Sequence, residues 1–265
     1  MYDFAYHKPS SIADAVKILS ADPEARPLSG GQTLLPALKH RLNKPSAIVD
    51  LSGIAELRGV KRDGSKVVIG ALTTHREIAG SPEVRAAIPP LARMAEHIGD
   101  VQVRNRGTLG GSVANNDPAA DYPAAVLALT ATIVTDKRRI AADDFFQGMF
   151  TTALEPGELL VAIEFPVPQK AGYAKMRNPA SRYVMAGAFV AKLSDGSVRV
   201  AINGAGPGVF RQAEMEKALA ASWSPDAVAN IQQSPDGLNS DIHGSAEYRA
   251  HLVTVMAKRA VADAG

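Results

Sequence analysis

The 265-residue sequence contains no cysteine. This absence excludes disulfide bonds, thiol catalysis and cysteine-held iron–sulfur clusters from the chain. The six histidines show no H-x-x-x-H or similar spacing, so no metal site is expected either. Redox chemistry would therefore need a bound organic cofactor, because the side chains supply none.

The sequence also lacks a strong charge of one sign and a long apolar run. The net charge is +2 and the basic residues are scattered, which argues against a nucleic acid partner. No apolar run approaches the ~20 residues of a membrane-spanning helix, so no transmembrane segment is expected. The first ten residues lack a basic segment followed by an apolar one, so we expect no secretory signal and predict a cytoplasmic location.

The remaining composition is ordinary for a globular protein, with 46% apolar and 21% charged residues in a chain long enough for two domains. A strand predicted over residues 159–165 is closed by Pro166-Val167-Pro168, and this stop marks the best domain boundary. We therefore predict domains over residues 1–168 and 169–265. The first is expected to divide into two subdomains near residues 53–60.

Glycine gathers in two places, and the first is Ser29-Gly30-Gly31-Gln32-Thr33, the first glycine stretch. It separates a strand predicted over residues 26–29 from a helix predicted over 33–42, and a second strand is predicted over 47–51. This is a βαβ unit in which the helix N-terminus presents free N–H groups that suit an anion such as phosphate. The spacing matches neither G-x-G-x-x-G nor the P-loop, and a simple connecting turn is the alternative.

The second glycine stretch runs from Arg106 to Pro118 and contains Thr108-Leu109-Gly110-Gly111-Ser112. A glycine pair lets backbone N–H groups approach a bulky ligand, and nearby hydroxyls and amides can hydrogen-bond it. A tight turn between two core elements is the alternative. The presence of two such stretches in one chain favours a phosphate-sized ligand. Downstream, helices are predicted from Asp121 and from a cap at Asp143 or Asp144.

Four segments, in this order and spacing, resemble the flavoprotein (medium) subunit of the molybdenum hydroxylases, the enzymes of the xanthine dehydrogenase and carbon monoxide dehydrogenase type. They are residues 28–34, 98–112, 115–121 and 158–166, and the resemblance covers essentially the whole chain. It implies an α+β protein. The resemblance further implies that a two-subdomain FAD-binding fold of the vanillyl-alcohol-oxidase (PCMH) type is followed by a small α+β C-terminal domain.

The resemblance also implies which residues contact FAD, with both glycine stretches on its pyrophosphate. The residues carried over by position are Pro27, Leu28, Ser29, Gly30, Gly31, Gln32, Thr33, Leu34, Ile98, Thr108, Leu109, Gly110, Gly111, Ser112, Asp121, Leu160, Lys175 and Tyr183. Among them Asp121 would hydrogen-bond the cofactor, Leu160 would pack near the adenine and Tyr183 near the isoalloxazine ring. Ile98 would be an apolar contact and Lys175 a further cofactor contact.

Each isolated position in that set also has a structural alternative. Asp121 could instead cap a helix, Lys175 could be a solvated strand lysine, and Tyr183 could serve packing. Arg104 and Arg106 flank the second glycine stretch and could either help bind phosphate or be surface charges. No catalytic acid or base and no metal ligand is predicted, because FAD would carry the redox chemistry.

As implied by the resemblance, the chain is an FAD-binding electron-transfer subunit. It would accept electrons from [2Fe–2S] clusters on a small subunit and pass them to an external acceptor, while a large molybdopterin subunit oxidises the substrate. Assembly as a heterotrimer or a dimer of heterotrimers is expected. The alternatives are a stand-alone flavin oxidase of a small alcohol and a scaffold that has lost FAD.

Overall fold

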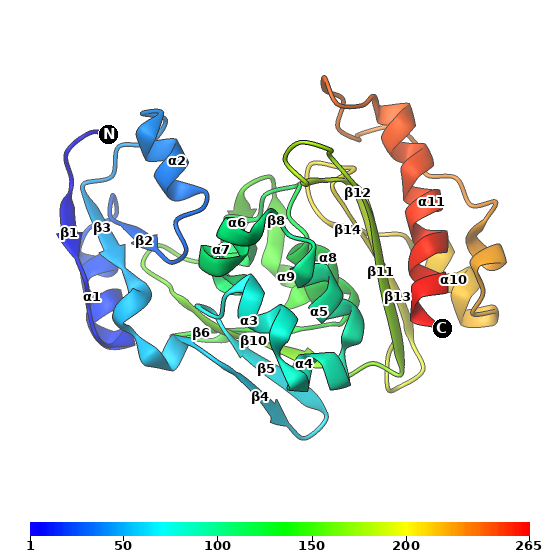
Figure 1. Ribbon diagram of the computed structural model, residues 1–265, viewed down its shortest axis with the longest axis horizontal. Helices are drawn as coiled ribbons and strands as arrows, with labels where there is room; N and C mark the ends of the chain where they lie inside the picture. The colour runs from blue at the N-terminus through cyan, green and yellow to red at the C-terminus, as the bar shows by residue number, and fades with distance from the viewer.

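The computed structural model describes all residues from 1 to 265, and its elements form three parts that lie side by side (Figure 1). An N-terminal part carries a small sheet, a central part carries helices over a larger sheet, and a C-terminal part carries a sheet covered by two helices. Three hydrophobic clusters form the core. The cluster of 10 buried residues centres on the N-terminal part, the cluster of 33 fills the central part and reaches one face of the C-terminal sheet, and the cluster of 16 lies between that sheet and its helices.

The N-terminal part is a parallel sheet with strand order β1-β3-β2. Its elements are β1 (Ala5–His7), α1 (Ile12–Ala21), β2 (Arg26–Leu28), α2 (Leu34–Lys39) and β3 (Ala47–Asp50), followed by the 3-10 turns η1 (Leu51–Gly53) and η2 (Ala55–Leu57). The predicted βαβ unit is confirmed, since α2 connects two parallel strands. The helix ends three residues earlier than predicted, because Arg41 adopts a left-handed backbone with φ of 58°.

The central part holds a five-stranded antiparallel sheet with strand order β4-β5-β10-β6-β7. Its strands are β4 (Val60–Asp63), β5 (Lys66–Gly70), β6 (Thr132–Thr135), β7 (Arg139–Ala141) and β10 (Leu160–Pro166), and β8 (Phe146–Gly148) pairs with β9 (Thr151–Thr152) as a separate hairpin. Its helices are α3 (His75–Gly80), α4 (Pro82–Ala87), α5 (Pro89–Glu96), α6 (Val101–Arg106), α7 (Leu109–Asn115), α8 (Tyr122–Ala128) and α9 (Ala142–Phe145). The strand predicted over residues 159–165 is found one residue later.

One prediction for this part, and one alternative left open by the sequence, were wrong. The core of the second glycine stretch is not a turn, because Gly110 and Gly111 lie in the first turn of helix α7. Thr108 nucleates that helix by accepting a hydrogen bond from the Gly111 N–H at 3.1 Å, which offsets the poor helix propensity of glycine. Neither Asp143 nor Asp144 caps α9, which already begins at Ala142.

The C-terminal part is an antiparallel sheet with strand order β11-β12-β13-β14. Its strands are β11 (Lys170–Arg177), β12 (Val184–Lys192), β13 (Val198–Asn203) and β14 (Phe210–Arg211), and its helices are α10 (Ala213–Ala221), η3 (Pro225–Val228) and α11 (Ala246–Ala264). Helix α11 covers one face of the sheet (Figure 1). No helix of the chain combines the length and the apolar character that crossing a bilayer requires.

Candidate cofactor site

The two glycine stretches touch each other. A side chain on Gly30 would overlap the backbone carbonyl of Arg106, and a Cβ on Gly111 would lie only 2.6 Å from the Ser29 hydroxyl oxygen. The Thr108 hydroxyl donates to that same Ser29 oxygen at 3.3 Å. Glycine at these positions is therefore a packing requirement, and segments that are distant in sequence form one continuous surface.

The first glycine stretch leaves a row of backbone donors free. None of the five N–H groups from Gly30 to Leu34 donates a hydrogen bond within the chain. Gly31 has a φ of 75°, which only glycine adopts readily, and the Thr33 side chain does not cap α2. Successive unpaired N–H groups around a left-handed residue form a concave anion site. These residues therefore fit a pyrophosphate.

The second glycine stretch contributes differently from the prediction. Its N–H groups are mostly used inside the protein: Leu109 donates to Thr73, Gly110 to Ala71, and Ser112 to the Thr108 carbonyl. The Ser112 hydroxyl is partly exposed and has no partner in the chain. This stretch therefore supplies a rigid wall and a hydroxyl, while the free amides belong to the first stretch.

The two arginines beside the second stretch have separate roles. The Arg104 guanidinium donates to the carbonyls of Ile98 and Gly99, both at 3.1 Å, so it builds the turn before α6. Arg106 is exposed and forms no ion pair, so its charge stays available next to the Gly30 contact.

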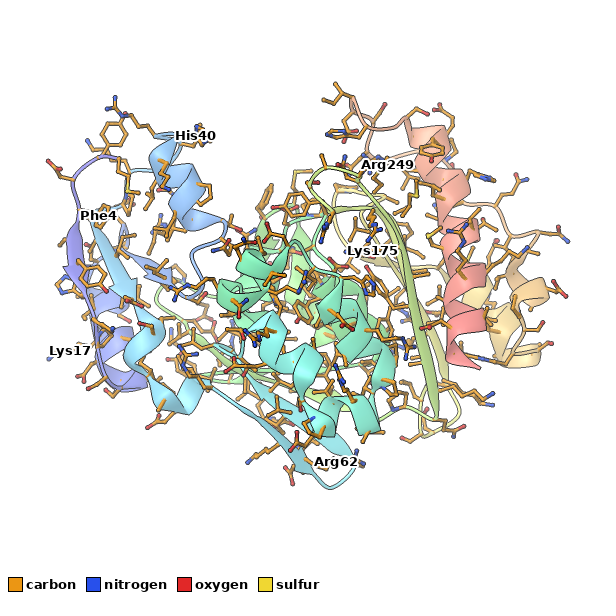
Figure 2. The ribbon with its side chains drawn as sticks, in the orientation of Figure 1. Phe4, Lys17, His40, Arg62, Lys175 and Arg249 are labelled. Atoms are coloured by element: carbon orange, nitrogen blue, oxygen red, sulfur yellow. The ribbon has the colours of Figure 1, made fainter.

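A second group of predicted residues assembles around the Lys175 ammonium, on the edge of the C-terminal sheet that faces the central helices (Figure 2). Its Nζ lies 2.8 Å from Asp121 Oδ1, and the two side chains are 6% and 4% exposed. Nζ also donates to the carbonyls of His97 and Arg182 at 3.1 and 3.2 Å. These carbonyls directly precede Ile98 and Tyr183, so four of the predicted contacts lie within this one cluster.

Asp121 is a buried carboxylate with several partners. Burial raises the pKa of its carboxyl, and the Lys175 ammonium opposes that rise. The Tyr173 hydroxyl donates to Asp121 Oδ1 at 2.9 Å. Asp121 occupies the N-cap position of α8, but its side chain makes no capping hydrogen bond. Lys175 is not a solvated strand lysine. The alternatives from the sequence, a helix cap formed by the Asp121 side chain and a solvated Lys175, are therefore unsupported.

The remaining predicted side chains differ in how far they are exposed. Leu160 is 4% exposed and belongs to the central core rather than to a surface. Pro27 is exposed in the middle of β2, whereas Leu28 and Leu34 are half-buried. Tyr183 is 56% exposed, and burial together with the Asp117 charge raises the pKa of its hydroxyl.

Sequence reasoning missed His75, which contacts the start of the second glycine stretch at Gly107. Its backbone N–H donates to the Gly107 carbonyl at 3.0 Å, and the side chain is 4% exposed. Burial lowers the pKa of His75 to about 4, and the nearby Arg104 charge adds to this effect. Thr74 caps helix α3 directly before His75, and this pattern is visible in the sequence, but the contact of His75 with Gly107 is not.

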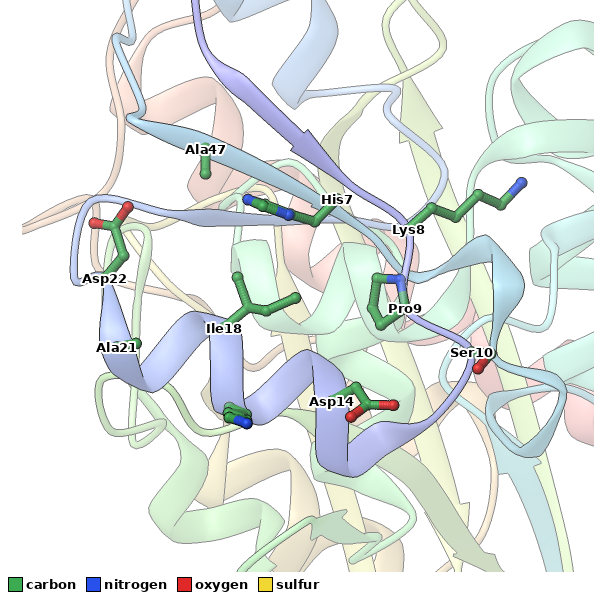
Figure 3. A pocket seen from close by; sticks show the side chains of 10 residues that line it. His7, Lys8, Pro9, Ser10, Asp14, Ile18, Ala21, Asp22 and Ala47 are labelled. Carbon is green, nitrogen blue, oxygen red and sulfur yellow. The ribbon is translucent and has the colours of Figure 1, made fainter.

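Two of the hollows on the surface differ in which parts of the chain line them. The larger, about 690 Å³, lies between α1 and the N-terminal sheet among residues such as Lys8 and Asp14, and shares no residue with either glycine stretch (Figure 3). The smaller, about 380 Å³, is lined by Tyr183 and by residues of both the central and the C-terminal parts. We call it the Tyr183 cavity.

Comparison with protein families divides the chain into two matched regions. Residues 2–168 match the family described as FAD binding domain in molybdopterin dehydrogenase. Residues 173–264 match the CO dehydrogenase flavoprotein C-terminal domain. The α+β FAD-binding fold and the FAD cofactor expected from the sequence are thereby confirmed.

Similar curated proteins match along nearly their full length. The carbon monoxide dehydrogenase medium chain of Hydrogenophaga pseudoflava is 35% identical, with 97% of this chain and 96% of that protein covered. The nicotine 6-hydroxylase medium subunit of Paenarthrobacter nicotinovorans is 37% identical, with 98% and 96% covered.

Solved structures agree with this assignment. A chain of the reconstituted CO dehydrogenase from Oligotropha carboxidovorans superposes with a TM-score of 0.93 at 36% identity, covering 99% of this chain and 98% of that one. A chain of quinoline 2-oxidoreductase from Pseudomonas putida 86 gives 0.89 at 30% identity, covering 99% and 97%. The chain therefore belongs to the family of FAD-binding medium subunits of the molybdopterin dehydrogenases.

Proposed function

We propose that this chain is the FAD-binding electron-transfer subunit of a multi-subunit molybdenum hydroxylase. It accepts electrons from [2Fe–2S] clusters of a small subunit and passes them to an external acceptor. The observation that carries the proposal is the row of free N–H groups from Gly30 to Leu34, set against the wall formed by Thr108 and Gly111. The names of the similar proteins, which are medium chains and medium subunits, support it.

FAD supplies the redox chemistry when bound, and the chain's residues bind and orient it. The free amides of the first glycine stretch and the Ser112 hydroxyl would hold the pyrophosphate. The remaining predicted contacts, with Asp121, Lys175 and Tyr183 in one cluster, would hold the rest of the cofactor. Because neither stretch contains a lysine or arginine between Gly30 and Leu34 or between Gly107 and Ser112, backbone dipoles and hydroxyls carry the anion binding.

The proposal includes the domain division and the partners. The chain divides into residues 1–168 and 169–265, which the extents of the two matched families support. With no cysteine of its own, it needs a small subunit for the [2Fe–2S] clusters and a large subunit for the molybdopterin. The complex is a heterotrimer or a dimer of heterotrimers in the cytoplasm.

Purification from the native cell tests the proposal. A tagged chain should bring down a small iron–sulfur protein and a large molybdopterin protein, and the yellow complex should contain about one FAD per chain. Cell fractionation should place it in the soluble fraction. Recovery as a lone monomer whose flavin is reduced directly by a simple alcohol would contradict the proposal and favour the stand-alone oxidase.

A further inference from the structure

Tyr173 is a residue of strand β11 that is not one of the predicted cofactor contacts. Its side chain packs against the central core, and its ring lies 5.9 Å from that of Phe189 on β12. It lines neither the Tyr183 cavity nor the larger hollow. Burial and the Asp121 charge raise the pKa of its hydroxyl well above the ordinary value, so the hydroxyl keeps its proton and acts as a donor.

The surrounding strands leave room for this hydroxyl and direct its proton. Gly187 stands opposite Lys175 on β12, and a Cβ at that glycine would lie 3.1 Å from the Tyr173 hydroxyl oxygen. The Asn203 side-chain amide donates to the same oxygen at 3.4 Å. Because this amide meets the oxygen as a donor, the hydroxyl proton points to the remaining partner, the Asp121 carboxylate.

The Asp121 carboxylate is held through only one of its two oxygens. The Tyr173 hydroxyl donates to Oδ1 at 2.9 Å, and the Lys175 ammonium lies 2.8 Å from the same atom. Oδ2 accepts no hydrogen bond within the chain, and it is not among the unpaired atoms that are fully enclosed. A carboxylate oxygen that is unpaired but still reachable suits a donor supplied by a bound ligand.

We propose that Tyr173 is a positioning residue for FAD, because its hydroxyl fixes the Asp121 carboxylate so that the free Oδ2 accepts a hydrogen bond from a cofactor hydroxyl. Two partners on Oδ1 hold the carboxylate in one orientation, and Tyr173 supplies one of them. Tyr173 thus acts through Asp121. The inference rests on the proposed function, since it takes the contact between Asp121 and FAD from it.

Tyr173 also favours the charged form of Asp121. Burial raises the pKa of the Asp121 carboxyl, whereas the Lys175 ammonium, the Tyr173 hydroxyl and the His97 side chain at the end of α5 lower it. Loss of the hydroxyl therefore moves this pKa further up, and a protonated carboxyl is a poorer acceptor. As the pH falls, FAD affinity should decline at a higher pH in Tyr173→Phe than in the native chain.

FAD titration of Tyr173→Phe tests the proposal, because phenylalanine keeps the ring beside Phe189 and removes only the hydroxyl. The purified complex is freed of flavin, and rebinding of FAD is followed by flavin fluorescence between about pH 5 and pH 8. We expect an affinity about tenfold lower at neutral pH and a difference that widens toward acid. His97 is present in both chains, so it does not contribute to this difference.

A matched control removes a comparable bond elsewhere. The Tyr6 hydroxyl donates to the Asp50 carboxylate at 2.6 Å in the N-terminal part, away from Asp121. Tyr6→Phe should therefore leave FAD affinity and its pH profile unchanged. An equal loss in Tyr6→Phe, undiminished affinity in Tyr173→Phe, or a loss in Tyr173→Phe that is the same at every pH would overturn the proposal.

A double-variant cycle separates positioning from packing. In Asp121→Ala there is no carboxylate to position, so the addition of Tyr173→Phe should lower FAD affinity no further, and an equal further loss would overturn the proposal. If Asp121→Ala does not fold, the pH profile of Tyr173→Phe decides alone. A native complex that binds no FAD would contradict the proposed function itself, which keeps the two failures distinct.

Discussion

At the scale of single residues, the site depends on two glycines, whose lack of a side chain lets the glycine stretches pack together. The hydrogen on Gly111 leaves room for the Ser29 hydroxyl, and the hydrogen on Gly30 leaves room for the Arg106 carbonyl. Either added side chain would force the two glycine stretches apart. The spacing between the stretches, and with it the position of the free amides, is therefore set by two glycines.

Replacement of Gly111 should remove FAD binding without unfolding the chain. In Gly111→Leu the new side chain meets the Ser29 and Thr108 hydroxyls, so we expect FAD affinity to fall more than about a hundredfold. Gly80→Ala is a matched control, because nothing lies within 4 Å of a Cβ at that position. Flavin absorbance after gel filtration measures retention, and circular dichroism checks the fold. Undiminished retention in Gly111→Leu would contradict the site.

His75 should make the chain sensitive to acid. The folded chain holds the His75 pKa at about 4, whereas its ordinary value is 6.5, so unfolding takes up a proton between these pH values. Stability should therefore fall as the pH drops through this window, by up to roughly 3 kcal/mol from this residue.

Urea denaturation at several pH values measures this effect. His75→Gln should flatten the decline between pH 6.5 and about 4, and His40→Gln, at an exposed histidine, should not. Identical pH profiles for the native chain and His75→Gln would show that His75 is not held neutral.

At the scale of elements, sequence patterns predicted the helices and strands whose formation depends on neighbouring residues in the chain. The βαβ unit around the first glycine stretch and the strand ending at Pro166 follow from apolar runs and turn residues, and both are present. Helix α7 was missed, because two glycines oppose a helix in isolation. Its capping threonine and its contact with Ser29 override that preference, and the contact is invisible in a local window.

The candidate site was likewise predictable only where residues close in sequence decide its geometry. The sequence pattern predicted a phosphate-sized ligand at both glycine stretches, and only the first has a row of free amides. It did not show that the second stretch uses its amides internally, or that Leu160 is enclosed in the core. It could not pair Asp121 with Lys175, since that pair depends on how the C-terminal sheet packs against α8.

At the scale of the whole molecule, residues 118–121 join the central part to the C-terminal sheet. Val184 and Gly204 donate backbone hydrogen bonds to the carbonyls of Ala119 and Pro118 at 3.2 and 2.9 Å. The Asn203 side chain donates to the Ala120 carbonyl at 2.7 Å. The buried Asp121–Lys175 pair completes this connection, so the predicted cofactor contacts also hold the two parts of the chain together.

Loss of Lys175 should therefore weaken the whole fold. Lys175→Met leaves Asp121 buried without its cation, and removal of one member of such a pair costs about 3–5 kcal/mol. In the double variant Asp121→Asn with Lys175→Met no charge remains unpaired, so most of that loss should be recovered. Urea denaturation of the flavin-free chains isolates the effect from cofactor binding. The single and double variants share the altered side chain at position 175. If the double variant is as unstable as the single one, the pair therefore acts through packing rather than charge.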